Sequence, residues 1–129
     1  MARVKVTADD LKKSMVLEPE WYPAEIIKYD YEPNKNKDSY NHVYDFKVLS
    51  PESAAGVTVR TWFSEKALGT NEFVGFYETL TGTKVDRKAG FEIQDMSAAK
   101  GKKLEIHIKN GTYNGRTTNN IDGFRPLQG

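Results

Sequence analysis

Gly101-Lys102-Lys103-Leu104-Glu105-Ile106-His107-Ile108-Lys109 is the stretch from which the fold is most directly inferred. Leu104, Ile106 and Ile108 alternate with polar residues, and this period of two is typical of a half-buried strand. The chain continues with Asn110-Gly111-Thr112-Tyr113-Asn114-Gly115, which holds two Asn-Gly pairs, the strongest short-range signal for a β-hairpin. The return strand is expected over 116–121. The C-terminal part is therefore predicted to be a cationic hairpin with an aromatic tip.

The composition bounds the class of protein. With 129 residues, 38% hydrophobic and 29% charged, the chain fits one domain with a single core. The net charge is only +1, yet six basic and two acidic side chains within residues 100–129 give that part a local charge of +4. The absence of cysteine excludes disulfides and thiolate metal sites. No apolar run has the length of a signal peptide or a membrane span, so we expect a cytoplasmic protein without a membrane partner.

Three more strands are predicted upstream, over residues 21–31, 40–49 and 57–64. Short polar loops join them, which indicates an antiparallel meander. In the first strand the apolar phase changes at Ile26-Ile27, as it does at a β-bulge, and this places Tyr29 and Tyr31 on the face opposite Ile26. In the third strand Val57, Val59, Thr61 and Phe63 share the core-facing side.

A helix is predicted after the third strand, over residues 70–81. Thr70 can cap its start, Gly82 can end it, and Phe73, Phe76, Tyr77 and Leu80 follow the helical spacing of a core-facing stripe. A shorter helix is expected over 7–13, in an N-terminal extension (1–16) that precedes the main domain (17–129). Residues 91–93 are interpreted as a short strand and 96–100 as a turn.

Three strands, a helix and two strands form the element order of an OB-fold. The sequence therefore predicts an all-β domain with one helix, a five-stranded antiparallel Greek-key barrel with the helix between strands 3 and 4.

With these elements placed, the chain resembles the phage-encoded single-stranded DNA-binding proteins of OB-fold type. The resemblance is carried by residues 19–26, by Tyr44-Asp45-Phe46-Lys47-Val48, by residues 56–63 and by the 101–115 hairpin, and it covers roughly residues 17–127. It implies a viral protein that binds single-stranded DNA in replication or recombination inside the host cell, with RNA and self-association left open. Related proteins end in an acidic tail that recruits partners, whereas this sequence ends Arg125-Pro126-Leu127-Gln128-Gly129, so no recruitment through such a tail is expected.

Single-strand binding requires aromatic faces for bases and cations for phosphates in one groove. In an OB-fold this groove crosses strands 2 and 3 between the first–second and fourth–fifth loops. The candidate binding residues are Tyr29, Tyr31, Lys35, Lys37, Tyr40, Lys47, Arg60, Trp62, Lys109, Tyr113 and Arg116.

Two placements stay open from the sequence alone. Trp62 is out of phase with Phe63 and is expected beside Arg60 on the outer face, but it could instead cover a small second core under the N-terminal segment. Only one of Tyr29 and Tyr31 is needed in the groove, and the other could pack against a loop.

Catalysis is not indicated by any motif. His42 and His107 lie outside any metal-ligand spacing, and neither a phosphate-binding glycine loop nor a nucleophile elbow is present, so we expect no enzyme activity, metal or cofactor. The main alternative to nucleic-acid binding is a small-barrel protein–protein interaction or virion assembly module, in which the same aromatic residues form a dry interface.

Overall fold

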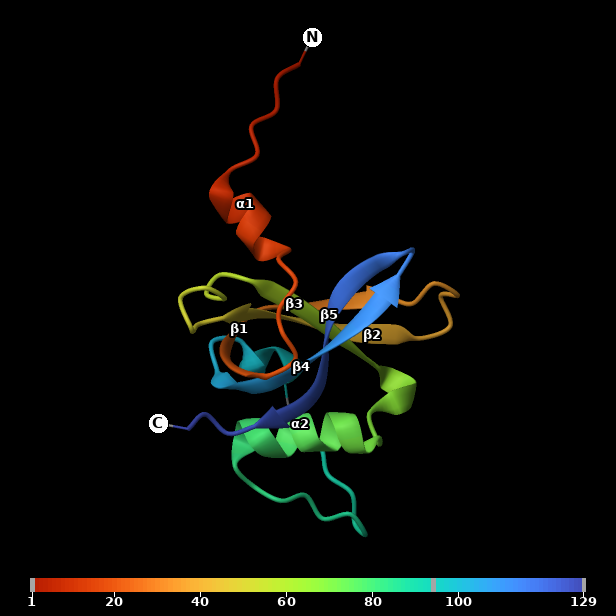
Figure 1. Ribbon diagram of the computed structural model, residues 1–129. Helices are drawn as coiled ribbons and strands as arrows, with labels where there is room; N and C mark the ends of the chain where they lie inside the picture. The colour runs from red at the N-terminus through yellow and green to blue at the C-terminus, as the bar shows by residue number, and fades with distance from the viewer. Residues whose placement is uncertain (1, 94, 129) are drawn as a thin grey trace.

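The computed structural model describes residues 2–93 and 95–128. It contains one five-stranded antiparallel sheet and a helix that covers one end of it (Figure 1). The elements are α1 (Ala8–Lys13), β1 (Trp21–Pro33), β2 (Tyr40–Val48), β3 (Thr58–Ser64), η1 (Glu65–Ala67), α2 (Asn71–Thr81), η2 (Met96–Ala99), β4 (Lys103–Tyr113) and β5 (Arg116–Arg125). None of the described helices is long and apolar enough to cross a lipid bilayer.

The strand order is β3-β2-β1-β4-β5, so β3 and β5 are the two edges of the sheet. The edges curl toward each other and lie in contact, but no hydrogen-bonded ladder joins them in the part of the chain that the structure describes. The predicted five-stranded barrel is therefore not closed by hydrogen bonds at this point. At this gap the rings of Phe63 on β3 and Phe124 on β5 are neighbours, with centroids 6.4 Å apart. We call this gap the β3–β5 seam.

The bulge predicted in the first strand is present. The register between β1 and β2 shifts between Ile26 and Lys28, which leaves Ile27 without a partner in the ladder. The extra residue has an effect opposite to the predicted one, because it returns Tyr29 to the inner face that Ile26 occupies. Tyr29 accordingly packs against the buried ring of Tyr44, with centroids 5.1 Å apart.

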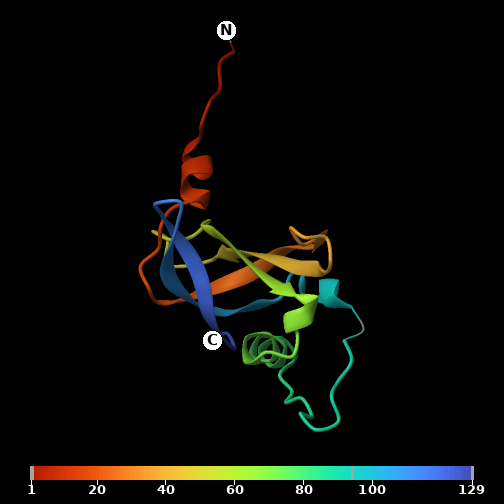
Figure 2. The ribbon, with the colours of Figure 1, turned by 90° about the vertical axis from the view of Figure 1, so that its right-hand side faces the viewer.

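Helix α2 closes the end of the core as the aromatic spacing predicts. The Thr70 hydroxyl accepts a hydrogen bond from the Phe73 backbone N–H, and Gly82 ends the helix in the left-handed conformation at φ 71°. Phe73 and Phe76 are buried against the sheet. In Figures 1 and 2 the helix lies below the sheet, on the side opposite the N-terminal arm.

The β4–β5 hairpin turns at Asn114-Gly115, where φ is 52° and 76°, so this Asn-Gly pair acts as predicted. The other pair does not turn the chain, since Asn110 and Gly111 lie inside β4 opposite Asn119 and Thr118. The absence of a side chain at Gly111 leaves room for the amide of Asn120, which a Cβ atom there would displace. The hairpin strands are consequently longer than predicted, and the tip is narrower.

The connection from α2 to β4 differs from the prediction. Residues 91–93 form no strand, and 96–99 form a 3-10 helix instead of a simple turn. The Tyr44 hydroxyl donates to the Met96 carbonyl at 2.9 Å, so this connection is held by its contact with the core instead of by strand pairing.

The N-terminal arm, residues 2–13, projects from the body (Figures 1 and 2). Thr7 and Asp10 form a capping box at the start of α1, but no side chain of this short helix is buried. The arm joins the domain where Lys12 Nζ donates to the carbonyls of Glu52 and Ser53. Leu17 is then buried, and its backbone is held by Asn110 and Asn119 of the hairpin.

Candidate nucleic-acid interface

A groove with a volume of about 900 Å³ lies between the outer side of β3 and the β4–β5 hairpin. Five of the predicted binding residues line it: Lys35, Arg60, Trp62, Tyr113 and Arg116. They come from the β1–β2 loop, from β3 and from the hairpin tip, so the groove exists only in the folded chain. We call it the upper groove.

Trp62 stands in this groove as the alternation along β3 predicts. Val59 and Phe63, which point to the opposite face of the strand, are buried, whereas Trp62 is 60% exposed. The alternative that Trp62 covers a second core under the N-terminal segment is wrong. Although Ser14 and Val16 of that segment line the same groove, they leave most of the indole open to solvent.

Arg60 is held by an ion pair across β2 and β3. Its Nε lies 2.8 Å from Asp45 Oδ1, and its Nη2 lies 3.3 Å from Asp45 Oδ2, so the ion pair is bidentate. The Asp45 carboxylate is largely buried, and its hydrogen bond raises the pKa of Arg60. The guanidinium is therefore fixed in orientation and partly neutralised, which limits the charge that it presents to a phosphate.

Asp45→Asn should tighten binding of single-stranded DNA several-fold, because it removes a negative charge beside the groove and releases Arg60 for phosphate. The slope of log affinity against log salt should become steeper by about 0.7, the value for one further phosphate contact on a single strand. Fluorescence titrations at several salt concentrations measure both quantities. Asp86→Asn, which makes the same charge change in the loop after α2, should alter neither, and weaker binding by Asp45→Asn would contradict this prediction.

Tyr113 and Arg116 flank the hairpin turn and are paired in the ladder. Tyr113 is 65% exposed, and both residues line the upper groove. The turn thus presents one aromatic face and one cation to the same space, as the sequence predicts.

The predicted tyrosines of the first two strands do not reach the upper groove. Tyr29, Tyr31 and Tyr40 lie on the inner side of the β1–β2 hairpin, on the same face as His42. The rings of Tyr31 and Tyr40 stack with centroids 4.6 Å apart. The reason is the bulge at Ile27, which turns this part of β1 inward.

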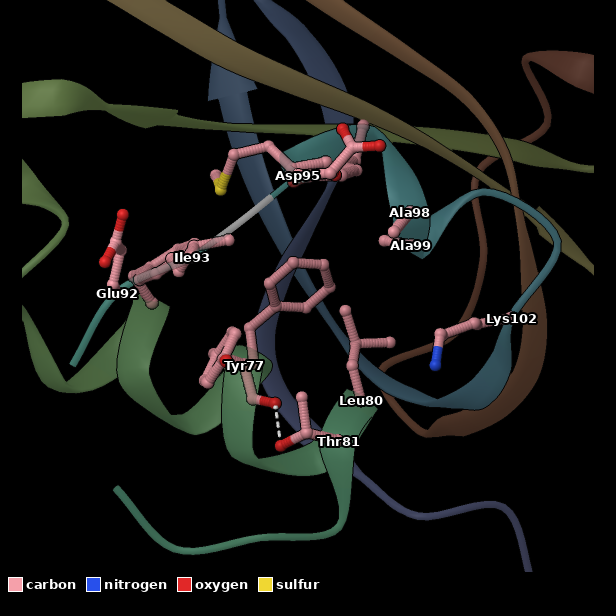
Figure 3. A pocket seen from close by; sticks show the side chains of 13 residues that line it. Tyr77, Leu80, Thr81, Glu92, Ile93, Asp95, Ala98, Ala99 and Lys102 are labelled. Atoms are coloured by element: carbon pink, nitrogen blue, oxygen red, sulfur yellow. Dashed lines mark hydrogen bonds between the residues drawn. The ribbon is translucent and has the colours of Figure 1, made fainter. Parts of the chain in front are cut away.

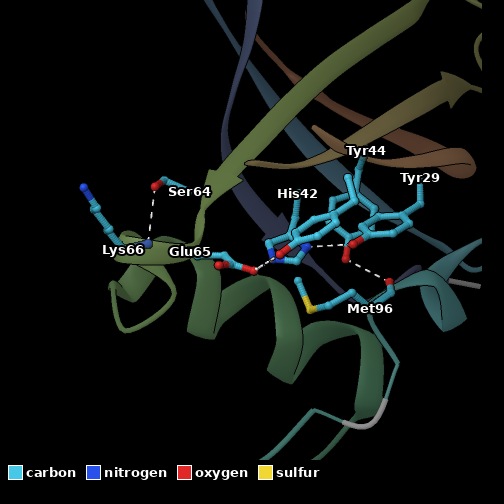
Figure 4. Close-up of polar contacts among 8 residues, drawn as sticks. Tyr29, His42, Tyr44, Ser64, Glu65, Lys66 and Met96 are labelled. Carbon is cyan, nitrogen blue, oxygen red and sulfur yellow. Dashed lines mark hydrogen bonds and ion pairs between the residues drawn. The ribbon is translucent and has the colours of Figure 1, made fainter. Parts of the chain in front are cut away.

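Hydrogen bonds hold this inner cluster together. The Tyr29 hydroxyl lies 2.7 Å from His42 Nδ1, and burial raises the pKa of Tyr29. The Tyr31 hydroxyl donates to Glu65 Oε1 at 2.5 Å, and this bond raises the pKa of Tyr31 to about 12. Glu65 Oε1 also lies 3.4 Å from His42 Nε2, and Figure 4 shows these two side chains facing each other. The cluster fixes the β1–β2 hairpin to η1, a structural role that the sequence analysis did not assign to His42.

Three predicted lysines, Lys37, Lys47 and Lys109, are exposed but do not line the upper groove. Lys47 lies on β2 opposite Thr58, and Lys109 lies on β4 opposite Asn120. The groove follows the β3–β5 seam instead of crossing β2, and β4 contributes to it only at its end, through Thr112 and Tyr113.

Several groove residues were missed by the sequence analysis. They are uncharged and polar for the most part: Ser14, Val16, Thr58, Val59, Thr112, Thr117, Thr118, Asn119 and Asn120. The run Thr117-Thr118-Asn119-Asn120 offers the only signal in the sequence, a polar stretch directly after the hairpin turn.

A separate cavity of about 270 Å³ lies between α2 and the connection to β4 (Figure 3). Tyr77 and Leu80 point into it from the helix, and Ile93 and Met96 line it from the connection. It shares no lining residue with the upper groove, and its charged lining residues are Glu92, Asp95 and Lys102. Its apolar walls do not suit a phosphate chain.

A comparison of the chain with protein-family models finds no match, and no curated protein matches it.

Proposed function

We propose that the domain is an OB-fold, a partly open barrel whose β3–β5 seam serves as the ligand site. β3 and β5 are the two edges of one sheet, which curls so that they come into contact. Helix α2, which lies between β3 and β4 in the sequence, covers the end of the core. An open seam of this kind is compatible with the fold, whose barrel is only partly closed.

The function that the upper groove supports best is sequence-tolerant binding of single-stranded DNA. The observation that carries this proposal is the convergence of Trp62 and Tyr113 with Lys35, Arg60 and Arg116 in one groove. Unpaired bases stack on the two exposed aromatic rings, and Lys35 and Arg116 neutralise phosphates of the same strand, while Arg60 contributes less because Asp45 holds it. Stacking does not depend on base identity, so the strand is bound with little regard to its sequence.

The biological role follows from the resemblance to phage single-stranded DNA-binding proteins. A protein of this type coats the strand, keeps it unpaired and protects it during replication or recombination, without chemistry. The alternative, a protein–protein or virion assembly module, requires a dry apolar patch. The threonine and asparagine side chains along the upper groove instead favour a hydrated site whose cations bind an anionic ligand.

The test is a fluorescence titration with oligo-dT and with duplex of the same length. Oligo-dT should bind more tightly, because base stacking requires unpaired bases. With Lys35 and Arg116 as the cations that neutralise phosphates in the wild type, log affinity should fall with log salt at a slope of about −1.4, from roughly −0.7 for each neutralised phosphate. Arg116→Ala should reduce that slope, whereas Lys88→Ala, the same charge change in the loop after α2, should not.

Two results would count against the proposal. Equal affinity for oligo-dT and duplex would leave only an electrostatic patch. Absence of binding to either, together with salt-insensitive self-association, would favour the protein–protein module.

A further inference from the structure

A second hollow, with a volume of about 400 Å³, continues the upper groove along the β3–β5 seam toward α2. It is lined by β3, by the first turns of α2 and by β5, the three elements that lie together in Figure 2. Trp62 lines both spaces, so the indole stands at the boundary between them. We call the second space the lower hollow.

The two spaces have opposite charge. The upper groove is lined by the cations Lys35, Arg60 and Arg116, whereas the charged residues lining the lower hollow are Glu72 and Asp122. A phosphate is attracted to the first and repelled from the second, because like charges destabilise each other at short range. The backbone of a bound strand therefore stays in the upper groove, and the part of a nucleotide that fits the lower hollow is its uncharged base.

The walls of the lower hollow suit a flat group with a polar edge. Trp62 offers an aromatic face, and Ile121 and Phe124 add apolar surface from β5. His107 Nδ1 lies 2.6 Å from Asp122 Oδ1, which fixes that carboxylate. Within residues 2–93 and 95–128, neither Asp122 Oδ2 nor the Glu72 carboxylate makes a hydrogen bond to another residue.

Carboxylates only accept hydrogen bonds, so they select among the bases. Cytosine presents its N4 amino group to such an acceptor, and adenine presents its N6 amino group. Thymine presents one ring N–H between two carbonyl oxygens, which a carboxylate repels. A base that carries an exocyclic amino group is therefore favoured over thymine at this position.

We propose that the lower hollow receives one base of the bound strand and prefers a base with an exocyclic amino group to thymine. This inference rests on the proposed single-strand function and adds a base preference at one position of an otherwise sequence-tolerant site. Glu72 and Asp122 are the residues that determine the preference, and Trp62 positions the base between the two spaces.

The experiment compares oligo-dC with oligo-dT of equal length, at a pH above neutral so that cytosine is unprotonated. Both are pyrimidine strands of similar size, so they differ chiefly at the base edge. Oligo-dC should bind about tenfold more tightly, the discrimination expected from one well-formed contact to a base edge. Glu72→Gln should bring the dC-to-dT ratio toward one, because the amide presents a donor as well as an acceptor.

Glu92→Gln is the matched control, since it removes the same charge beside the separate cavity under α2. It should keep the wild-type ratio. Equal binding of oligo-dC and oligo-dT by the wild type would overturn the inference but not the proposed function. Failure to bind either oligonucleotide would contradict the inference and the proposed function together. An unchanged dC-to-dT ratio in Glu72→Gln would also overturn the inference. So would loss of self-association in this variant, because the hollow would then be a contact with a second copy of the chain.

Discussion

Trp62→Ala should weaken binding of oligo-dT by about 1–3 kcal/mol and leave the fold intact. The magnitude is that of one base stacked on an aromatic ring. The fold should be unaffected because Trp62 is 60% exposed on an edge strand, whereas its neighbours Val59 and Phe63 supply the buried contacts. If the indole were part of the core, the substitution would instead lower the free energy of unfolding by about 3–5 kcal/mol.

Intrinsic fluorescence measures this prediction directly, because the chain has only two tryptophans. Oligo-dT should quench the wild-type signal, and most of that response should be lost in Trp62→Ala, which keeps Trp21. Trp21 is an internal control, since its ring is covered by the Arg125 guanidinium at 4.2 Å and lies outside the upper groove. Unfolding of Trp62→Ala, with normal binding by the fraction that stays folded, would show that the indole is structural.

Phe76→Ala should lower the free energy of unfolding by about 3–5 kcal/mol, the usual cost of truncating a buried phenylalanine. Phe76 is 1% exposed, and its ring centroid lies 5.0 Å from that of Tyr44, 5.2 Å from Phe63 and 4.9 Å from Phe124. It therefore connects α2 with both edges of the β3–β5 seam. Its removal leaves a cavity at the point where the two edges are held together.

Denaturant titration followed by circular dichroism measures this loss. Phe91→Ala is the matched control, because Phe91 is 41% exposed and its one ring contact is with Tyr77, at 4.8 Å, among the described residues. That change should cost less than about 1 kcal/mol. A similar decrease in the free energy of unfolding for the two variants would mean that α2 does not close the end of the core.

The sequence by itself determined the strands, the helix and the side on which Trp62 lies. The alternation of Val57, Val59 and Phe63 places Trp62 outside, because successive side chains of a strand point to opposite faces. Thr70 and Gly82 bound the helix through hydrogen bonds and backbone geometry within a few residues. These features depend on local periodicity and capping, which are present in the sequence itself.

The position of the ligand groove was decided by the tertiary structure. The sequence predicts a groove across β2 and β3, with Lys47 and Lys109 among its cations, but the groove follows the β3–β5 seam and neither lysine lines it. Which strands become the edges of a sheet depends on pairing between distant segments. Here those edges are β3 and β5, which contribute the neighbouring rings of Phe63 and Phe124.

The tertiary structure also decided two local features, and for the first of them, the face of Tyr29 and Tyr31, the prediction from the sequence was wrong. The bulge at Ile27 directs Tyr29 and Tyr31 inward, because the ladder with β2 determines which residue is left unpaired. Of the two Asn-Gly pairs, only Asn114-Gly115 turns the chain, and Gly111 instead makes room for the side chain of Asn120 across the hairpin. An Asn-Gly pair shows where the backbone is able to turn. The register between the two strands determines which of the possible turns forms.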